Sequence, residues 1–242
     1  MCMPPGNTVG TSRGWPPSGR SRRLTSEPAA DRSPAPGGDA HALVLAAGAS
    51  VRFGGAKLVA PWRGRPLIAH VAVAVGQAIA SGTLQGGVAV VPPRDTALGW
   101  HLATAGLRVV VNPEADTGLA SSLRVGLREL AVMAAPDRPR AALVVLADQP
   151  LLSGATISRL VGAWRRTGRS VRPRYASRPD EPGHPVLLDG ALWALAENLI
   201  GDQGLGAALR ARPDAVDLID VPGANPDVDT RADLLALEDQ TE

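Results

Sequence analysis

Several residue types are almost absent from this chain of 242 residues, and each scarcity excludes a class of structure. The only cysteine is Cys2, so an internal disulfide and a cysteine-ligated metal cluster are both excluded. No stretch reaches the roughly 18–20 uncharged apolar residues that a membrane-spanning helix needs. The N-terminus also lacks the apolar segment of a secretory signal. We therefore expect a cytoplasmic protein with no membrane partner.

Aromatic residues are scarce too, at 3% of the chain, and the charges nearly cancel. Residues 1–39 hold five arginines and three acids, whereas residues 40–242 hold 20 basic and 20 acidic residues. The net charge of +2 therefore resides in the N-terminal segment. A neutral body with few aromatic side chains argues against a dedicated nucleic-acid-binding protein. The alternative reading is that the basic N-terminal segment contacts nucleic acid.

Lysine occurs once. Of the 25 basic residues 24 are arginine, and the single lysine, Lys57, closes the Gly-rich segment LAAGASVRFGGAK at residues 45–57. Arginine does not replace lysine where a compact ammonium group must approach a phosphate. The position of the only lysine therefore indicates phosphate binding.

Composition divides the chain into two parts. Residues 1–39 are rich in Pro, Gly, Ser and Arg and have no hydrophobic period. They cannot bury enough apolar surface to offset the entropy of ordering, so we expect a disordered extension, or one added by a misplaced start codon. Residues 40–242 alternate between strand and helix patterns and are expected to form one domain.

Strands alternating with helices of about 10–15 residues indicate an α/β fold, of the Rossmann-like three-layer kind with a mostly parallel central sheet. In such sheets ligands bind beyond the carboxyl ends of the strands. The predicted strands are 42–47, 87–91, 108–111, 141–146, 170–175, 185–188 and 216–221. The predicted helices are 66–80, 96–105, 120–134, 153–166, 192–199, 204–210 and 231–238.

The loop after the first predicted strand carries glycines and two cations. Glycine lets backbone N–H groups approach phosphate oxygens without a Cβ clash, and Gly48 directly follows the apolar run. Arg52 and Lys57 can then place two cations on a polyphosphate. A lone Gly-rich turn is common between strands and helices, so the two cations carry the functional interpretation.

Carboxylates at two places are candidate metal ligands. Asp148 follows the apolar run at 141–146, and Mg²⁺ prefers one or two carboxylates plus phosphates and water. The alternative is that Asp148 is a helix-capping or turn residue before Pro150. Asp227 and Asp229 share a face of an extended segment, and Asp229 is the better candidate. The alternative is that Asp229 or Thr230 caps the following helix.

Two further loops hold polar groups. Asn112 and the small-residue turn from Gly118 to Ser122 offer backbone and hydroxyl groups to a base or sugar, or are ordinary helix-capping groups. His184 follows two nearby arginines, one of them Arg174, and this loop could receive an anionic second substrate.

These segments, in this order, resemble the molybdenum cofactor nucleotidyltransferases, and most closely the cytidylyltransferases, over about residues 42–238. The opening segment is similar to the family signature LAAGxSxRxGxxK. Residues 148–150 resemble its GDQP, residues 183–187 its GHPVL, residues 201–204 its GDxG and residues 227–234 its DxDTPxDL.

The resemblance implies that a terminal phosphate of molybdopterin cofactor attacks the α-phosphate of a nucleoside triphosphate, CTP for this branch, with release of pyrophosphate. It implies Mg²⁺ as the cofactor and a molybdoenzyme apoprotein as a further partner. The implied catalytic residues are Arg52 and Lys57, and the implied metal ligands are Asp148 and Asp229. Nucleotide-binding residues are Leu45, Ala46, Ala47, Gly48, Ser50, Asn112, Gly118 and Ser122. Acceptor-binding residues are Arg174, His184 and Asp202.

Three departures from the family pattern leave some questions open. Ala147 occupies the position of a glycine in the family pattern, and Arg231 that of a proline. Residues 205–206 replace an Ala-Arg pair of the family, which removes a cation. The acceptor could instead be a sugar phosphate, a methylerythritol phosphate or a phospho-acid. The chain could also be a non-catalytic molybdenum cofactor carrier. The sequence does not decide between CTP and GTP as the nucleotide, because selection of the base rests on backbone contacts.

Overall fold

The structure is a computed structural model that describes residues 1, 40–48, 52–134 and 138–239. A seven-stranded sheet forms its middle layer, in the order β5-β4-β1-β6-β8-β7-β9. Six of its strands run parallel, and β8 alone is antiparallel to its neighbours β6 and β7. This confirms the expected α/β fold with a mostly parallel sheet. The strands are β1 (Ala40–Leu45), β4 (Gly87–Val91), β5 (Arg108–Val111), β6 (Ala141–Leu146), β7 (Ser170–Tyr175), β8 (Val186–Asp189) and β9 (Val216–Val221).

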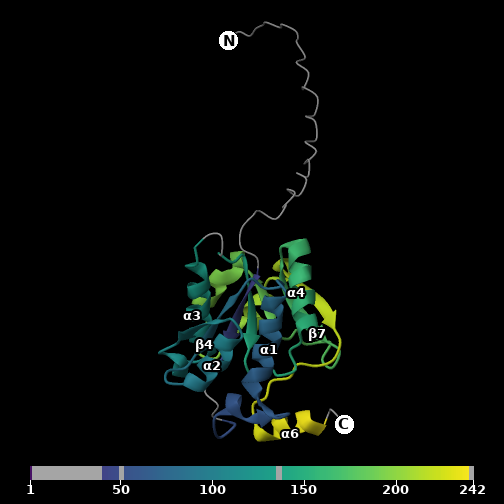
Figure 1. Ribbon diagram of the computed structural model, residues 1–242. Helices are drawn as coiled ribbons and strands as arrows, with labels where there is room; N and C mark the ends of the chain where they lie inside the picture. The colour runs from purple at the N-terminus through teal and green to yellow at the C-terminus, as the bar shows by residue number, and fades with distance from the viewer. Residues whose placement is uncertain (2–39, 49–51, 135–137, 240–242) are drawn as a thin grey trace. The chain divides into compact units, whose positions relative to one another are not determined.

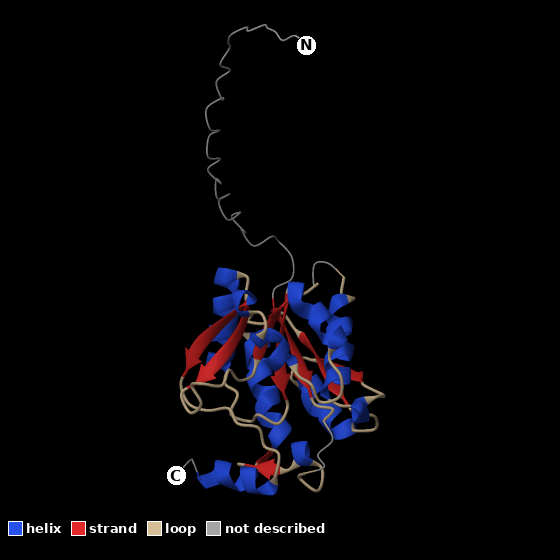
Figure 2. Ribbon diagram, turned by 180° about the vertical axis from the view of Figure 1, so that it is seen from behind, coloured by secondary structure: helices blue, strands red, loops and turns tan. Residues whose placement is uncertain are grey.

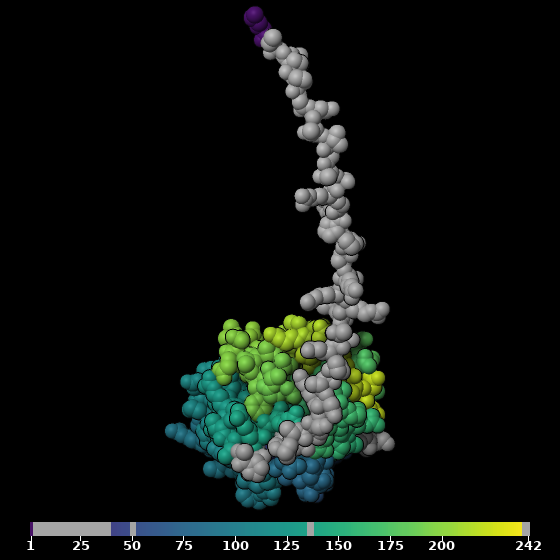
Figure 3. Space-filling model, turned by 90° about the horizontal axis from the view of Figure 1, so that it is seen from above, coloured from purple at the N-terminus to yellow at the C-terminus, as the bar shows by residue number. Residues whose placement is uncertain are grey.

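Helices cover both faces of the sheet, so the domain has three layers (Figure 1, Figure 2). Side chains alternate along each strand, and Ala42 and Val44 of β1 face one core while Leu43 and Leu45 face the other. The first core is covered by α1 (Leu67–Ala80), α2 (Thr96–Thr104) and α4 (Gly154–Thr167). The second is covered by α3 (Leu119–Ala131), the 3-10 helix η3 (Gly190–Asn198) and α5 (Leu205–Arg210). Figure 3 shows the light-green η3 region against teal α3.

A third, smaller core lies beside the sheet. It joins the hairpin of β2 (Pro61–Trp62) and β3 (Arg65–Pro66) to α6 (Arg231–Asp239). Its buried side chains are Phe53, Trp62, Leu67, Val228 and Leu237. Figure 1 shows α6 at the lower end of the domain, beside the blue segment that follows β1. The hairpin is not among the elements predicted from the sequence, and it brings the C-terminal residues next to the Gly-rich loop.

Most predicted elements are found with small shifts at their ends. The bounds of β4, β5, β6, β7 and β9 agree with the prediction. The first strand begins at Ala40 and ends at Leu45, two residues earlier than expected, and the segment expected as helix 192–199 is the 3-10 helix η3. Ser153 caps α4 as expected, because its Oγ accepts a hydrogen bond from Thr156 N at 3.1 Å. Residues 2–39, which we expect to form a disordered extension, lie outside the described residues.

Among the described helices, none is both long and apolar enough to cross a bilayer.

The close approach of β1 and β4 depends on Gly87. A Cβ at this position would lie 2.6 Å from the carbonyl oxygen of Ala42 and 2.7 Å from Leu107 Cδ2. We expect Gly87→Ala to lower the free energy of unfolding by about 1–3 kcal/mol, because the strand backbone must shift. Urea denaturation measures this change.

The matched control is Gly99→Ala in α2, where a Cβ would meet Val109 Cγ1 at an ordinary 3.8 Å. Its stability should be unchanged or raised, since alanine favours a helix over glycine by about 1 kcal/mol. Equal stability of the two variants would show that the β1–β4 spacing does not require glycine.

Candidate active site

A cavity of about 670 Å³ lies beyond the carboxyl ends of β1 and β6, where the sequence predicts ligand binding. Five segments that are far apart in the sequence line it together. Ser50 lies outside the described residues. The lining consists of Leu45, Ala46, Ala47, Gly48, Arg52, Lys57, Leu58, Ala115, Asp116, Gly118, Leu119, Ser122, Leu146, Ala147, Asp148, Asp202, Asp227 and Asp229.

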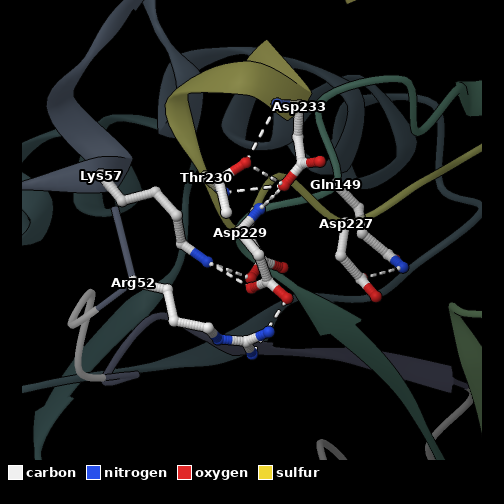
Figure 4. Close-up of polar contacts among 8 residues, drawn as sticks. Arg52, Lys57, Gln149, Asp227, Asp229, Thr230 and Asp233 are labelled. Atoms are coloured by element: carbon white, nitrogen blue, oxygen red, sulfur yellow. Dashed lines mark hydrogen bonds and ion pairs between the residues drawn. The ribbon is translucent and has the colours of Figure 1, made fainter. Parts of the chain in front are cut away.

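The single lysine binds both predicted metal ligands, and Figure 4 shows it next to Asp229. Lys57 Nζ donates to Asp148 Oδ2 at 2.7 Å and to Asp229 Oδ1 at 3.3 Å. Arg52 pairs with the second oxygen of Asp229 at 3.0 Å. The Lys57 side chain is 11% exposed and that of Arg52 is 74% exposed, so solvent screens the lysine's ion pairs far less. We call Lys57, Asp148 and Asp229 the ion cluster.

Backbone hydrogen bonds bring the carboxylates of the ion cluster together. Ala147 N donates to Leu45 O at 3.1 Å, which extends the β1–β6 pairing and places Asp148 beside the loop after β1. Val228 N donates to Asp148 O at 3.0 Å, and the fully buried Val228 side chain anchors this contact in the third core. Asp227 and Asp229, on either side of Val228, both line the cavity.

The cap of α6 leaves Asp229 free for the ion cluster. Thr230 Oγ1 accepts from Asp233 N at 3.2 Å, and Asp233 Oδ2 accepts from Thr230 N at 2.7 Å and from Asp229 N at 3.0 Å. This reciprocal pair is a capping box with aspartate at its fourth position. Thr230 rather than Asp229 is therefore the cap, and this settles the alternative that the sequence left open.

The carboxylates fit a divalent cation. Asp148 Oδ1 is buried and has no hydrogen-bond partner among the described residues. Burial raises the pKa of the Asp227 carboxyl, and the negative charges of Asp148 and Asp229 raise it further. In the described part of the chain no three His, Cys, Asp or Glu side chains form a metal site by themselves. A hard cation that also binds phosphate oxygens needs only one or two carboxylates.

The opposite wall of the cavity is formed by the start of α3. Gly118 and Ser122 line it, as the sequence predicts, but Asn112 does not. Asn112 is buried, and its Nδ2 donates to Ser121 Oγ at 2.9 Å and to Ser122 Oγ at 3.0 Å. Asn112 therefore supports the wall, and its predicted contact with nucleotide stays a prediction.

A second cavity, of about 220 Å³, adjoins the first at Asp227. His184 lines it, as expected for the acceptor loop, together with Arg172 and Tyr175. Arg174 lines neither cavity and pairs with Asp220 of β9 at 2.8 Å. The sequence could not choose between the two arginines because residues two apart share one face of a strand.

Asp202 also departs from its expected place. The resemblance groups Asp202 with the acceptor residues, but in the structure it lines the large cavity, and His184 lines the small one.

A chain of buried side chains connects the two cavities. Asn225 Nδ2 donates to His184 O at 3.3 Å and to Gln149 Oε1 at 3.1 Å, and Gln149 Nε2 donates to Asp227 Oδ1 at 2.7 Å. Tyr175 OH also donates to His184 O, at 2.9 Å. Gln149 belongs to the Asp-Gln-Pro segment, whose aspartate alone drew attention, and no sequence signal points to Asn225.

The His184 ring is electrically neutral. Burial, together with the smaller effect of the positive charge of Arg172, lowers the pKa of His184 to about 4. Arg172 Nε in turn donates to Gly183 O at 3.4 Å, so the arginine and the histidine loop are held together. The small cavity therefore combines two guanidinium groups, those of Arg172 and Arg178, with a neutral ring that can donate or accept a hydrogen bond.

Comparison with known proteins agrees with this geometry. The family model of the MobA-like NTP transferase domain matches residues 42–216. Nicotine blue oxidoreductase of Paenarthrobacter nicotinovorans is 36% identical over 197 residues, which span 78% of this chain and 91% of that protein.

Two solved structures of Rv0371c from Mycobacterium tuberculosis H37Rv share the fold. One has a TM-score of 0.68 at 26% identity and covers 83% of this chain and 97% of that chain. The other, a complex with manganese, has a TM-score of 0.67 at 24% identity and covers 84% and 100%. With a family match over most of the domain and a relative at 36% identity, the chain belongs to the family of MobA-like NTP transferase domains.

Proposed function

We propose that this nucleotidyltransferase transfers CMP from CTP to the terminal phosphate of molybdopterin cofactor, with Mg²⁺ as its metal and pyrophosphate as the second product. The ion cluster carries the proposal, because it places one shielded ammonium group and two carboxylates at one end of a nucleotide-sized cavity. The Asp-Gln-Pro and Gly-His-Pro segments support the molybdopterin acceptor, since both resemble the cytidylyltransferase branch.

The triphosphate would lie at the cationic end of the cavity. Arg52 and Lys57 supply positive charge there, and a Cβ on Gly48 would meet no atom within 4 Å, so the backbone has open space before it. Lys57 would exchange its carboxylate partners for phosphate oxygens. Both cations would then neutralise the negative charge that grows on the leaving pyrophosphate.

The reaction needs positioning more than proton transfer. An oxygen of the acceptor phosphate forms a new bond to the α-phosphorus while the bond to the bridging oxygen of the β-phosphate breaks in line. The acceptor phosphate is already ionised at pH 7, so no strong general base is required.

Asp148 and Asp229 would hold the divalent ion, which neutralises charge on the phosphate oxygens. The unpartnered Asp148 Oδ1 supports a divalent ion in this place, and the manganese complex of Rv0371c supports a divalent ion as the metal.

The small cavity is the proposed acceptor site. Arg172 offers a guanidinium to an anionic group, and the neutral His184 ring can hydrogen-bond a heterocycle. Asp227 lines both cavities, so an acceptor in the small cavity would lie next to the ion cluster. We propose Arg172 and His184 as acceptor residues, in place of Arg174.

A second candidate function, oxidoreductase activity, is favoured by one observation. The relative at 36% identity is named as an oxidoreductase that acts on nicotine blue. In that case the large cavity would hold a dinucleotide electron donor, and the carboxylates of the ion cluster would have no catalytic role.

Pyrophosphate release from the full chain tests the proposal. The assay uses Mg²⁺ and each of the four nucleoside triphosphates, with purified molybdopterin cofactor, with a sugar phosphate, with methylerythritol phosphate or with no acceptor. We expect release with CTP and molybdopterin cofactor, and none from Asp148→Asn. Release with another acceptor would replace molybdopterin. No release with any pair, together with oxidation of NADH or NADPH by added nicotine blue that Asp148→Asn leaves intact, would establish the oxidoreductase instead.

Lys57→Arg is expected to lower kcat by about 100-fold with the fold intact, since removing a preorganised charge contact at a reaction centre costs that order. The guanidinium keeps the charge but changes its shape. Arg52→Lys is the matched control, and the largely exposed Arg52 side chain predicts a much smaller loss. Near-normal turnover of Lys57→Arg would show that catalysis does not require a lysine at this position.

The lowered pKa of His184 predicts a pH dependence of stability. The ring binds a proton below about pH 6.5 in the unfolded chain, but only below about pH 4 in the folded chain. Stability should therefore fall as the pH drops through this window, and His184→Gln should reduce the fall. Histidine ring NMR of the folded protein measures the midpoint directly. A His184 midpoint near 6.5 would contradict the lowered pKa.

A further inference from the structure

The turn that carries Asp202 is fixed against the start of α3. Ala120 N donates to Gly201 O at 3.0 Å, and Gly118, at φ 111°, is so close that a Cβ on it would lie 2.4 Å from Gly201 C. Leu119 N donates to Asp202 Oδ1 at 3.4 Å. Backbone and side chain of the turn thus both engage the first residues of α3.

These contacts make the start of α3 unsuitable for phosphate. The free N–H groups at a helix N-terminus ordinarily attract anions, but here the Gly201 carbonyl and the Asp202 carboxylate already accept from two of them. Asp116 also lines this wall and adds a second negative charge. Like charges would repel a triphosphate from this end.

The opposite end of the cavity has the cations. Asp148 follows β6 on one side of β1, whereas α3 follows β5 on the other side, in the sheet order β5-β4-β1-β6. Lys57 and Arg52 lie with Asp148 and Asp229, away from Asp202 across this order. Charge alone therefore orients a bound nucleotide, with phosphates at the ion cluster and the nucleoside at α3.

We propose, resting on the nucleotidyltransferase function above, that Asp202 is a nucleoside-recognition residue and does not bind the acceptor. The hydrogen bond from Leu119 N fixes one carboxylate oxygen, and an ionised carboxylate can only accept further hydrogen bonds. Its ligand is a hydrogen-bond donor on the nucleoside, either a ribose hydroxyl or the exocyclic amino group of cytosine. The small cavity around His184 does not include Asp202.

Calorimetric titration of the full chain with CTP and Mg²⁺, in the absence of acceptor, tests this assignment. We expect Asp202→Asn to weaken CTP binding by about tenfold or more, the usual loss for a hydrogen bond to a charged group. Asp214→Asn, which removes an exposed carboxylate outside both cavities, should bind CTP as the wild type does.

Three analogues identify the donor and show that the variant is folded. If the donor is a ribose hydroxyl, 2′-deoxy- or 3′-deoxy-CTP should bind equally to the wild type and to Asp202→Asn. If the donor is the amino group, UTP should do so.

If the wild type binds CTP and Asp202→Asn binds it with the same affinity, the assignment of Asp202 is overturned, but the proposed transferase function is not. A wild type that binds no triphosphate would overturn both.

Discussion

The Lys57 ammonium group binds two carboxylates that lie 91 and 172 residues further along the chain, and the rest of the site depends on this contact. Like-charged carboxylates repel one another, and the ammonium group offsets that repulsion in a place where the lysine is largely shielded from water. The same contact marks where a metal and a polyphosphate would bind, because phosphate oxygens can replace the carboxylates as partners of the lysine and a metal ion can replace the lysine as the partner of the carboxylates. Arginine would not serve equally, since its planar fork is larger and more rigid.

The fold serves mainly to bring those three residues together. Parallel pairing of β1 and β6 aligns the loops that carry Lys57 and Asp148. Asp229 is held by its neighbours in the chain. Val228 is buried and donates a backbone hydrogen bond to Asp148, and Thr230 caps the start of α6. The third core therefore has a functional consequence beyond stability, because it attaches the C-terminal helix to the Gly-rich loop.

The sequence predicts the sheet well because buried parallel strands read as short apolar runs, and five strands have the predicted bounds. It also predicts the loops that meet, since parallel strands end at one edge. It does not predict the β2–β3 hairpin, whose paired segments are only two residues long. The choice of Arg172 over Arg174 and the placing of Asp202 depend on tertiary contacts between distant segments, which local pattern does not contain. The same holds for the support that Asn112 gives to the cavity wall.

The exchange of partners at Lys57 is the central claim, and calorimetric titration with Mn²⁺ tests it most directly. The wild type should bind Mn²⁺ weakly alone and more tightly with CTP, because the triphosphate draws Lys57 away from Asp148 and Asp229. Lys57→Met should bind Mn²⁺ more tightly than the wild type in the absence of nucleotide, since its carboxylates are released. Equal Mn²⁺ affinities of the two proteins without nucleotide, and no gain on adding CTP, would contradict the account.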